Sequence, residues 1–116
     1  MANGSTGRPL VWLHGQVRSP PFSTQARIEA GVLFRRLQHG ESLSFPQSRP
    51  LPIIGPACHE LRIRDAGVSW RIVYHLRPDA VVVLAVFSKK SRATPQSEIF
   101  ASGVRLRRYL RDIGKG

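Results

Sequence analysis

The strongest constraint on the fold is a run of three short segments with strand-like patterns, residues 59–64, 70–77 and 80–87. In the first two segments apolar and polar residues alternate, the period of a β-strand with one buried face. The third segment is apolar throughout, as expected for a strand covered on both faces. The residues between the segments, 65–67 and 78–79, are typical of tight turns. Three strands joined in this way predict an antiparallel meander.

Helices are predicted on both sides of this meander. Ser23 is a good N-cap for a helix that reaches about residue 38, and Gly40 follows where a left-handed C-terminal residue belongs. A second helix is predicted to start at Thr94-Pro95, because proline is favoured in the first turn of a helix. Between them, residues 41–56 contain four prolines, and we expect an ordered surface loop there.

The order of these elements predicts one small α+β domain. The short apolar run at residues 10–13 is a further strand, which can add at the sheet edge or beside the central strand. We expect a small antiparallel sheet, made of this N-terminal strand and the three-strand meander, flanked by helices. The helices should cover one face and leave arginines on the other. Residues 9–116 form the domain, and residues 1–8 read as a disordered leader.

The charge of the chain narrows the class of ligand. Lysine and arginine number 18 against 7 acidic residues, which gives a net charge of +11, and arginine outnumbers lysine by fifteen to three. Arginine grips phosphate with a planar fork of donors and stacks on nucleobases, so this bias favours a nucleic-acid ligand. Solubility or a GC-rich genome would produce the same bias without a functional reason, and this alternative stays open.

Other residue types exclude several classes of protein. The single Cys58 cannot form an intramolecular disulfide, which favours a reducing compartment. The four histidines are scattered, so the sequence has no spacing suited to a metal site, and we expect no metal and no cofactor. The N-terminus lacks the apolar core of a signal peptide, and the longest apolar run is too short to span a bilayer. We therefore expect a cytoplasmic protein without membrane contact.

If the strands pair in sequence order, several cations meet on one patch. Arg62 and Arg64 come from the first segment, Arg71 from the second, and Lys89 and Lys90 follow the third. Few carboxylates lie among them, so the patch is suited to a polyanion. Three plainer interpretations stay open: a solvated strand face, an ordinary charged loop, and a structural ion pair of Arg71 with Asp65 or Glu60.

Four segments of the chain resemble a known family. They are VWLHGQVRSPPFS at residues 11–23, HELRIRD at 59–65, WRIVYHL at 70–76 and VFSKKSRATP at 86–95. Their order and spacing are similar to those of the RelE/HigB superfamily of type II toxins, closest to its HigB-like, phage-derived branch. The resemblance implies a RelE-like fold and an endoribonuclease that cleaves mRNA, usually in the A site of the 30S ribosomal subunit. It also implies a cognate antitoxin, a small helix-turn-helix protein.

The resemblance also implies roles for individual residues. Arg71 matches a phosphate-contacting arginine of the family. The general base is chosen on other grounds: His59 is a candidate because an unperturbed imidazole titrates near neutrality, and Tyr74 and His75 are weaker candidates. The full set of candidate catalytic residues is Arg71, Arg64, Lys90 and His59, and the candidate RNA-binding residues are Arg62, Lys89 and Arg92.

Two positions depart from the family pattern. Glu60 stands where some members have lysine, and Phe100 stands near the place of a late tyrosine or histidine. Two other functions therefore stay open: inhibition of DNA gyrase, as in ParE-like relatives, and nucleic-acid binding without catalysis.

Overall fold

The computed structural model describes residues 7–13, 22–89 and 93–114. Its elements are, in chain order, β1 (Leu10–Trp12), α1 (Thr24–Gln38), β2 (Ser48–Pro50), β3 (Cys58–Asp65), β4 (Val68–Arg77), β5 (Ala80–Lys89) and α2 (Gln96–Gly114). The five strands form one sheet in the order β1-β5-β4-β3-β2. The predicted α+β class and the meander β3-β4-β5 are confirmed. The N-terminal strand β1 joins the edge of the sheet and runs parallel to β5, so the sheet is mixed.

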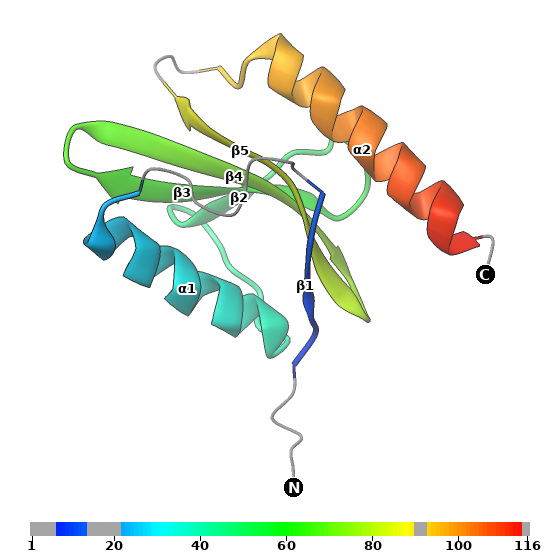
Figure 1. Cartoon of the computed structure of the whole chain (residues 1–116), viewed down its shortest axis with the longest axis horizontal. Helices are drawn as coiled ribbons and strands as arrows, with labels where there is room; N and C mark the ends of the chain where they lie inside the picture. Colours follow the sequence, from blue (N-terminus) through cyan, green and yellow to red (C-terminus); the bar gives the residue numbers. More distant parts are fainter. Residues whose placement is uncertain (1–6, 14–21, 90–92, 115–116) are drawn as a thin grey trace, which may run out of the picture.

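The two helices lie on opposite faces of the sheet (Figure 1). Five buried residues of α1, among them Phe34, pack against one face of β3, β4 and β5. Leu106 of α2 packs on the other face, against β4 and β5 residues such as Val73 and Val82. The expectation that both helices cover one face is therefore wrong. We call these two surfaces the α1 face and the α2 face.

A β-bulge adapts β5 to its two covered faces. Val73 of β4 pairs with Ala85, but the next residue, Tyr74, pairs with Val83, so Leu84 is an extra residue in β5. Leu84 and Ala85 both belong to the cluster on the α2 face, while Val83 packs on the α1 face. The extra residue bends the strand locally and changes which side chains face each helix.

The ends of α1 follow the sequence signals. The Ser23 side chain accepts a hydrogen bond of 3.1 Å from the Ala26 amide, which satisfies one free donor at the N-terminus. Gly40 has a φ of 93° just after the C-terminus, where the left-handed conformation suits glycine. Arg8 also holds this end of the helix, since its guanidinium donates to the Leu37 carbonyl (2.7 Å) and to the Arg77 carbonyl (2.8 Å).

Strand β2 was not predicted, because its three residues lie in the proline-rich segment. It pairs antiparallel with β3 and is the outermost strand, a place where proline is tolerated. Ser48 of β2 is buried, and its hydroxyl shares a hydrogen bond of 2.5 Å with the hydroxyl of Tyr74. The segment is thus fixed to the core.

Residues 7 and 8 of the predicted leader are described in the structure, and Arg8 is bonded to carbonyls of α1 and β4. Residues 1–6 of the predicted leader lie outside the described residues. Among the helices that the structure describes, neither is long and apolar enough to cross a membrane.

Candidate functional site: a cation cluster around a buried carboxylate

The register of the sheet brings most of the predicted cations together on the α2 face. Arg62 of β3 lies directly opposite Arg71 of β4. Ser69, two residues before Arg71, lies opposite Arg64 on one side and Lys89 on the other. Residues directly opposite in a sheet point to the same face, so the side chains from three strands gather near the β3–β4 turn.

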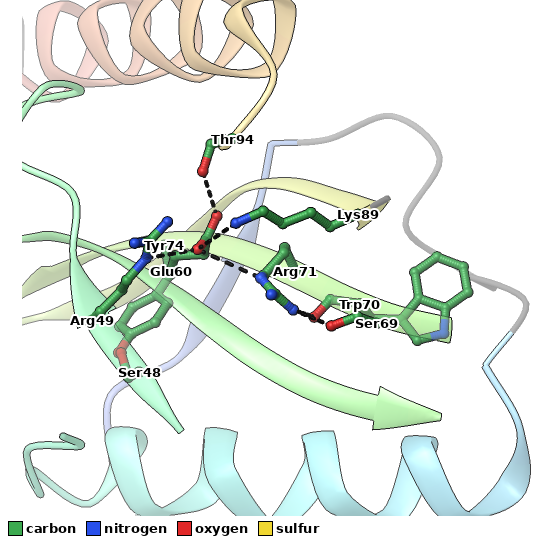
Figure 2. Close-up of polar contacts among 9 residues, drawn as sticks. All are labelled: Ser48, Arg49, Glu60, Ser69, Trp70, Arg71, Tyr74, Lys89 and Thr94. Carbon is green, nitrogen blue, oxygen red and sulfur yellow. Dashed lines mark hydrogen bonds and ion pairs between the residues drawn. The ribbon is translucent and has the colours of Figure 1, made fainter. Parts of the chain in front are cut away.

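Glu60 is the centre of this arrangement (Figure 2). Its carboxylate oxygen Oε1 lies 3.0 Å from Arg49 Nε, 3.5 Å from Arg71 Nε and 3.9 Å from Lys89 Nζ. The other oxygen, Oε2, accepts a hydrogen bond of 2.8 Å from the hydroxyl of Thr94. We call Arg49, Glu60, Arg71, Lys89 and Thr94 the Glu60 cluster. Its members come from β2, β3, β4, β5 and the segment that leads into α2.

Three members of the cluster are shielded from water. The Glu60 side chain is fully buried, and the side chains of Arg71 and Lys89 are only 7% and 5% exposed, whereas that of Arg49 is 40% exposed. Burying charges is costly unless they are paired, so the carboxylate explains how two cations can be held in this place. The open alternative of an ion pair between Arg71 and Glu60 is therefore confirmed. The other alternative, a pair with Asp65, does not form, because Asp65 accepts hydrogen bonds from Ser23 and Trp70.

The cluster holds more positive charge than Glu60 can balance. Three cations face one carboxylate, which leaves a surplus of two charges (3 − 1 = 2) before Arg62 and Arg64 are added. Burial lowers the pKa of Arg71, and the nearby charges of Arg62 and Arg49 lower it further, while Glu60 raises it. The pKa of Lys89 is also lowered, first by burial and then by the neighbouring arginines. A second anion at this place would relieve the repulsion among the cations.

Arg71 is held in a fixed orientation. Its Nη1 donates to the hydroxyl of Ser69 and to the Trp70 carbonyl, at 3.2 Å from the latter. Its Nε faces Glu60 but makes no hydrogen bond among the described residues. A guanidinium fixed in this way costs little further entropy when it binds a ligand.

A shallow polar hollow of about 410 Å³ lies beside the cluster. It is lined by Arg62, Arg64, Ser69 and the turn between β3 and β4. Arg64 is exposed there. The walls of the hollow therefore carry two arginines and Asp65, and Ser69 connects the hollow to Arg71.

The structure does not bring all of the predicted site residues together. His59 lies opposite Tyr74 and stacks on its ring, with centroids 5.3 Å apart, so it belongs to the α1 face. Burial lowers its pKa. The expectation that His59 joins the arginines is not met, because residues adjacent in a strand point to opposite faces. Lys90 and Arg92 lie outside the described residues.

The weaker candidates for the general base are also occupied elsewhere. Tyr74 bonds to Ser48, and burial raises its pKa. His75 lies on the α2 face, but its Nδ1 is 2.9 Å from the Pro56 carbonyl, at the far end of β3 from the turn. Phe100 is exposed on α2.

Sequence reasoning missed Arg49, Thr94 and the central role of Glu60. Side chains alternate between the faces of β3, which places Glu60 on the same face as Arg62 and Arg64, so its position among the cations could have been predicted from the sequence. No sequence signal pointed to Arg49, because its strand was not predicted, and Thr94 was interpreted as a helix cap alone.

The arrangement can bind and orient an anion. No group of three histidine, cysteine, aspartate or glutamate side chains suited to a metal is found in the part of the chain that the structure describes. Among the described residues that line the hollow there is no histidine or tyrosine, and its one carboxylate, Asp65, accepts hydrogen bonds from the Ser23 amide and the Trp70 indole.

Fold and site together define a class: a small α+β domain with a cluster of cations at one end of a five-stranded sheet. Residues 21–107 match the family of phage-derived Gp49-like proteins (DUF891). The chain therefore belongs to this family, which is a HigB-like toxin family in the RelE superfamily. A comparison with curated proteins finds no match.

Proposed function

We propose that this protein is the toxin of a type II toxin–antitoxin pair and acts as an endoribonuclease on mRNA at the ribosome. The observation that carries the proposal is the surplus of fixed cations around Glu60, next to an open polar hollow. Such a surface suits a phosphodiester that carries additional negative charge in the transition state. Membership of the Gp49-like family supports the same function.

In the proposed reaction the RNA 2′-hydroxyl attacks the adjacent phosphorus. A bond forms between the 2′-oxygen and phosphorus, the bond from phosphorus to the 5′-oxygen breaks, and the proton of the 2′-hydroxyl passes to the 5′-oxygen. Arg71 and Lys89 stabilise the charge on the non-bridging oxygens, and Arg62 and Arg64 hold flanking phosphates. Because preorganised donors act most strongly on charge that develops during reaction, each contributes on the order of 100-fold or more in rate.

The site would leave proton transfer to groups other than His59, since that residue lies on the opposite face. This observation favours a second candidate function, binding of RNA at the ribosome without cleavage. It also fits cleavage in which the ribosome or the substrate supplies the proton acceptor.

Inducible expression followed by primer extension on translated messages tests the proposal. We expect new 5′ ends at codon-linked positions. Arg64→Ala removes an exposed cation without breaking an ion pair of the Glu60 cluster, and Arg71→Lys keeps the charge but loses the planar fork. Both should reduce cleavage about 10- to 1000-fold while the circular dichroism spectrum is retained.

The alternatives give different outcomes. Intact transcripts during growth arrest would remove the ribonuclease proposal, and DNA damage without message cleavage would indicate gyrase inhibition. We further propose a small helix-turn-helix antitoxin as partner. Co-expression of such a protein from the neighbouring gene should restore growth.

A further inference from the structure

Phe45, in the segment between α1 and β2, is unusually exposed for a phenylalanine. Its side chain is 69% exposed, although burial of such a ring is strongly favourable. A single exposed apolar residue needs no explanation by itself. The position of this ring is what makes it informative, because the guanidinium carbon of Arg62 lies over it, 5.2 Å from the ring centroid.

The ring is presented from a fixed base. The Arg62 amide donates a hydrogen bond of 2.8 Å to the Gln47 carbonyl, and the Ser48 amide donates one of 3.1 Å to the Ser44 carbonyl. Ser48 is itself buried and bonded to Tyr74. Phe45 therefore lies within a turn whose backbone is fixed to β3 by hydrogen bonds.

Arg62 connects this ring to the cation cluster. It lies directly opposite Arg71 in the sheet, and its charge lowers the pKa of both Arg71 and Lys89. It also lines the polar hollow. Arg62 therefore lies between the ring of Phe45 and the cations of the Glu60 cluster.

This order matches the chemistry of a single-stranded nucleotide. Proteins recognise unpaired RNA by stacking its bases on aromatic rings and on guanidinium planes, while cations hold the adjacent phosphates. Each stacked base typically improves affinity about 10- to 100-fold, with little preference among the four bases.

We propose that Phe45 and Arg62 form a stacking platform for one nucleobase of single-stranded RNA, beside the phosphate bound by the Glu60 cluster. The proposal rests on the proposed function, since it assumes that the cluster binds an RNA phosphate. It adds a contact that recognises a nucleobase, whereas the cations recognise only the negative charge of the phosphates.

The test compares two oligomers of equal length and equal phosphate number. One is a single-stranded RNA made resistant to cleavage by 2′-O-methyl groups, and the other is its abasic counterpart. Dissociation constants are measured by fluorescence anisotropy at fixed salt, because phosphate contacts depend strongly on ionic strength. The ratio of the two constants isolates the contribution of the bases.

For the wild-type protein we expect the base-containing oligomer to bind about 10- to 100-fold more tightly than the abasic one. Phe45→Leu should reduce this ratio to less than about threefold and leave the affinity for the abasic oligomer unchanged. Phe45→Trp should restore the ratio. Trp12→Leu is the matched control, since Trp12 is also a partly exposed aromatic residue but lines a separate groove between β1 and α1, on the α1 face.

The outcomes separate the two proposals. If the wild-type protein binds neither oligomer, the phosphate-binding role given to the Glu60 cluster is refuted and the stacking platform with it, while primer extension decides separately whether mRNA is cleaved. If it binds both oligomers equally, or if the ratio is the same in wild type and Phe45→Leu, the stacking platform is refuted and the phosphate site stands. A loss of the ratio in Trp12→Leu as large as in Phe45→Leu would also refute the platform.

Discussion

Replacing Glu60 with glutamine should strongly destabilise the protein. Glutamine has nearly the same shape and keeps an oxygen that can accept from Thr94, so the change removes little except the negative charge. Arg71 and Lys89, with side chains only 7% and 5% exposed, then remain buried without a counter-ion. Loss of one partner from a buried ion pair typically costs about 3 to 5 kcal/mol.

We expect about 3 kcal/mol for Glu60→Gln, the low end of that range, because Arg49 is 40% exposed and is solvated in either case. Urea denaturation monitored by fluorescence measures the change. With a slope of about 1.5 kcal/mol per molar urea, as for a small protein, the midpoint should fall by about 2 M. Inorganic tripolyphosphate should recover more stability in the variant than in the wild type, because an anion bound at the surface of the cluster offsets positive charge that the variant leaves unbalanced.

Glu41→Gln provides the control. Glu41 pairs with Arg36 at 2.9 Å, but both side chains are about half exposed, so the loss should stay below about 1 kcal/mol. If Glu60→Gln lost no more than this control, the buried cations would not depend on Glu60, and our account of the cluster would be refuted.

Three other predictions concern residues outside the cluster. Tyr74→Phe leaves the buried hydroxyl of Ser48 without its partner and should cost about 1 to 3 kcal/mol in urea denaturation; an unchanged midpoint would show that the hydrogen bond contributes nothing. Burial lowers the pKa of His75 below its ordinary value of 6.5. As the pH falls through that value, the unfolded chain therefore binds more protons than the folded one, and the free energy of unfolding should decrease from pH 7 to pH 5. His75→Asn should flatten this pH dependence, and an equal slope in both proteins would contradict the assignment. Burial raises the pKa of Cys58 to about 11, so iodoacetamide at pH 8 should label it only as fast as the chain opens, and rapid labelling would count against its burial.

The local structure of the chain was largely predictable from its sequence. The alternation in β3 and β4, the turn residues between the strands and the cap at Ser23 all correspond to elements that the structure contains. These elements are determined by residues close together in the chain, so a regular apolar period or a capping residue is enough to predict them. Strand β2 escaped prediction because it is short and includes Pro50 at the sheet edge.

The distribution of elements over the two faces was harder to predict. Val73 and His75 share a face with Arg71, and this face was interpreted as polar because its sequence is mixed. In the structure Val73 packs in one cluster with Leu106 of α2, and His75 is buried next to the Pro56 carbonyl, while Arg71 is held by Glu60. The continuous apolar run of β5 already required cover on both faces, and it was the signal that should have placed the helices on opposite sides.

The site was predictable as a gathering of arginines but not as a balanced cluster. Arg62, Arg64 and Arg71 converge as the meander requires, and Lys89 joins them. Whether a buried carboxylate accepts several cations depends on distances between strands, and Arg49 and Thr94 reach Glu60 from segments distant in sequence.

The placement of Arg71 on β4 has a mechanical consequence. The same strand carries Val73 and Tyr74, which are almost wholly inaccessible to water and tie its backbone to both helical layers. A strand that is packed on both faces cannot shift or tilt when a ligand binds. A ligand that binds at this end of the sheet must therefore adapt its own conformation to the protein. Substitutions in the core that shift β4 will also displace the guanidinium of Arg71.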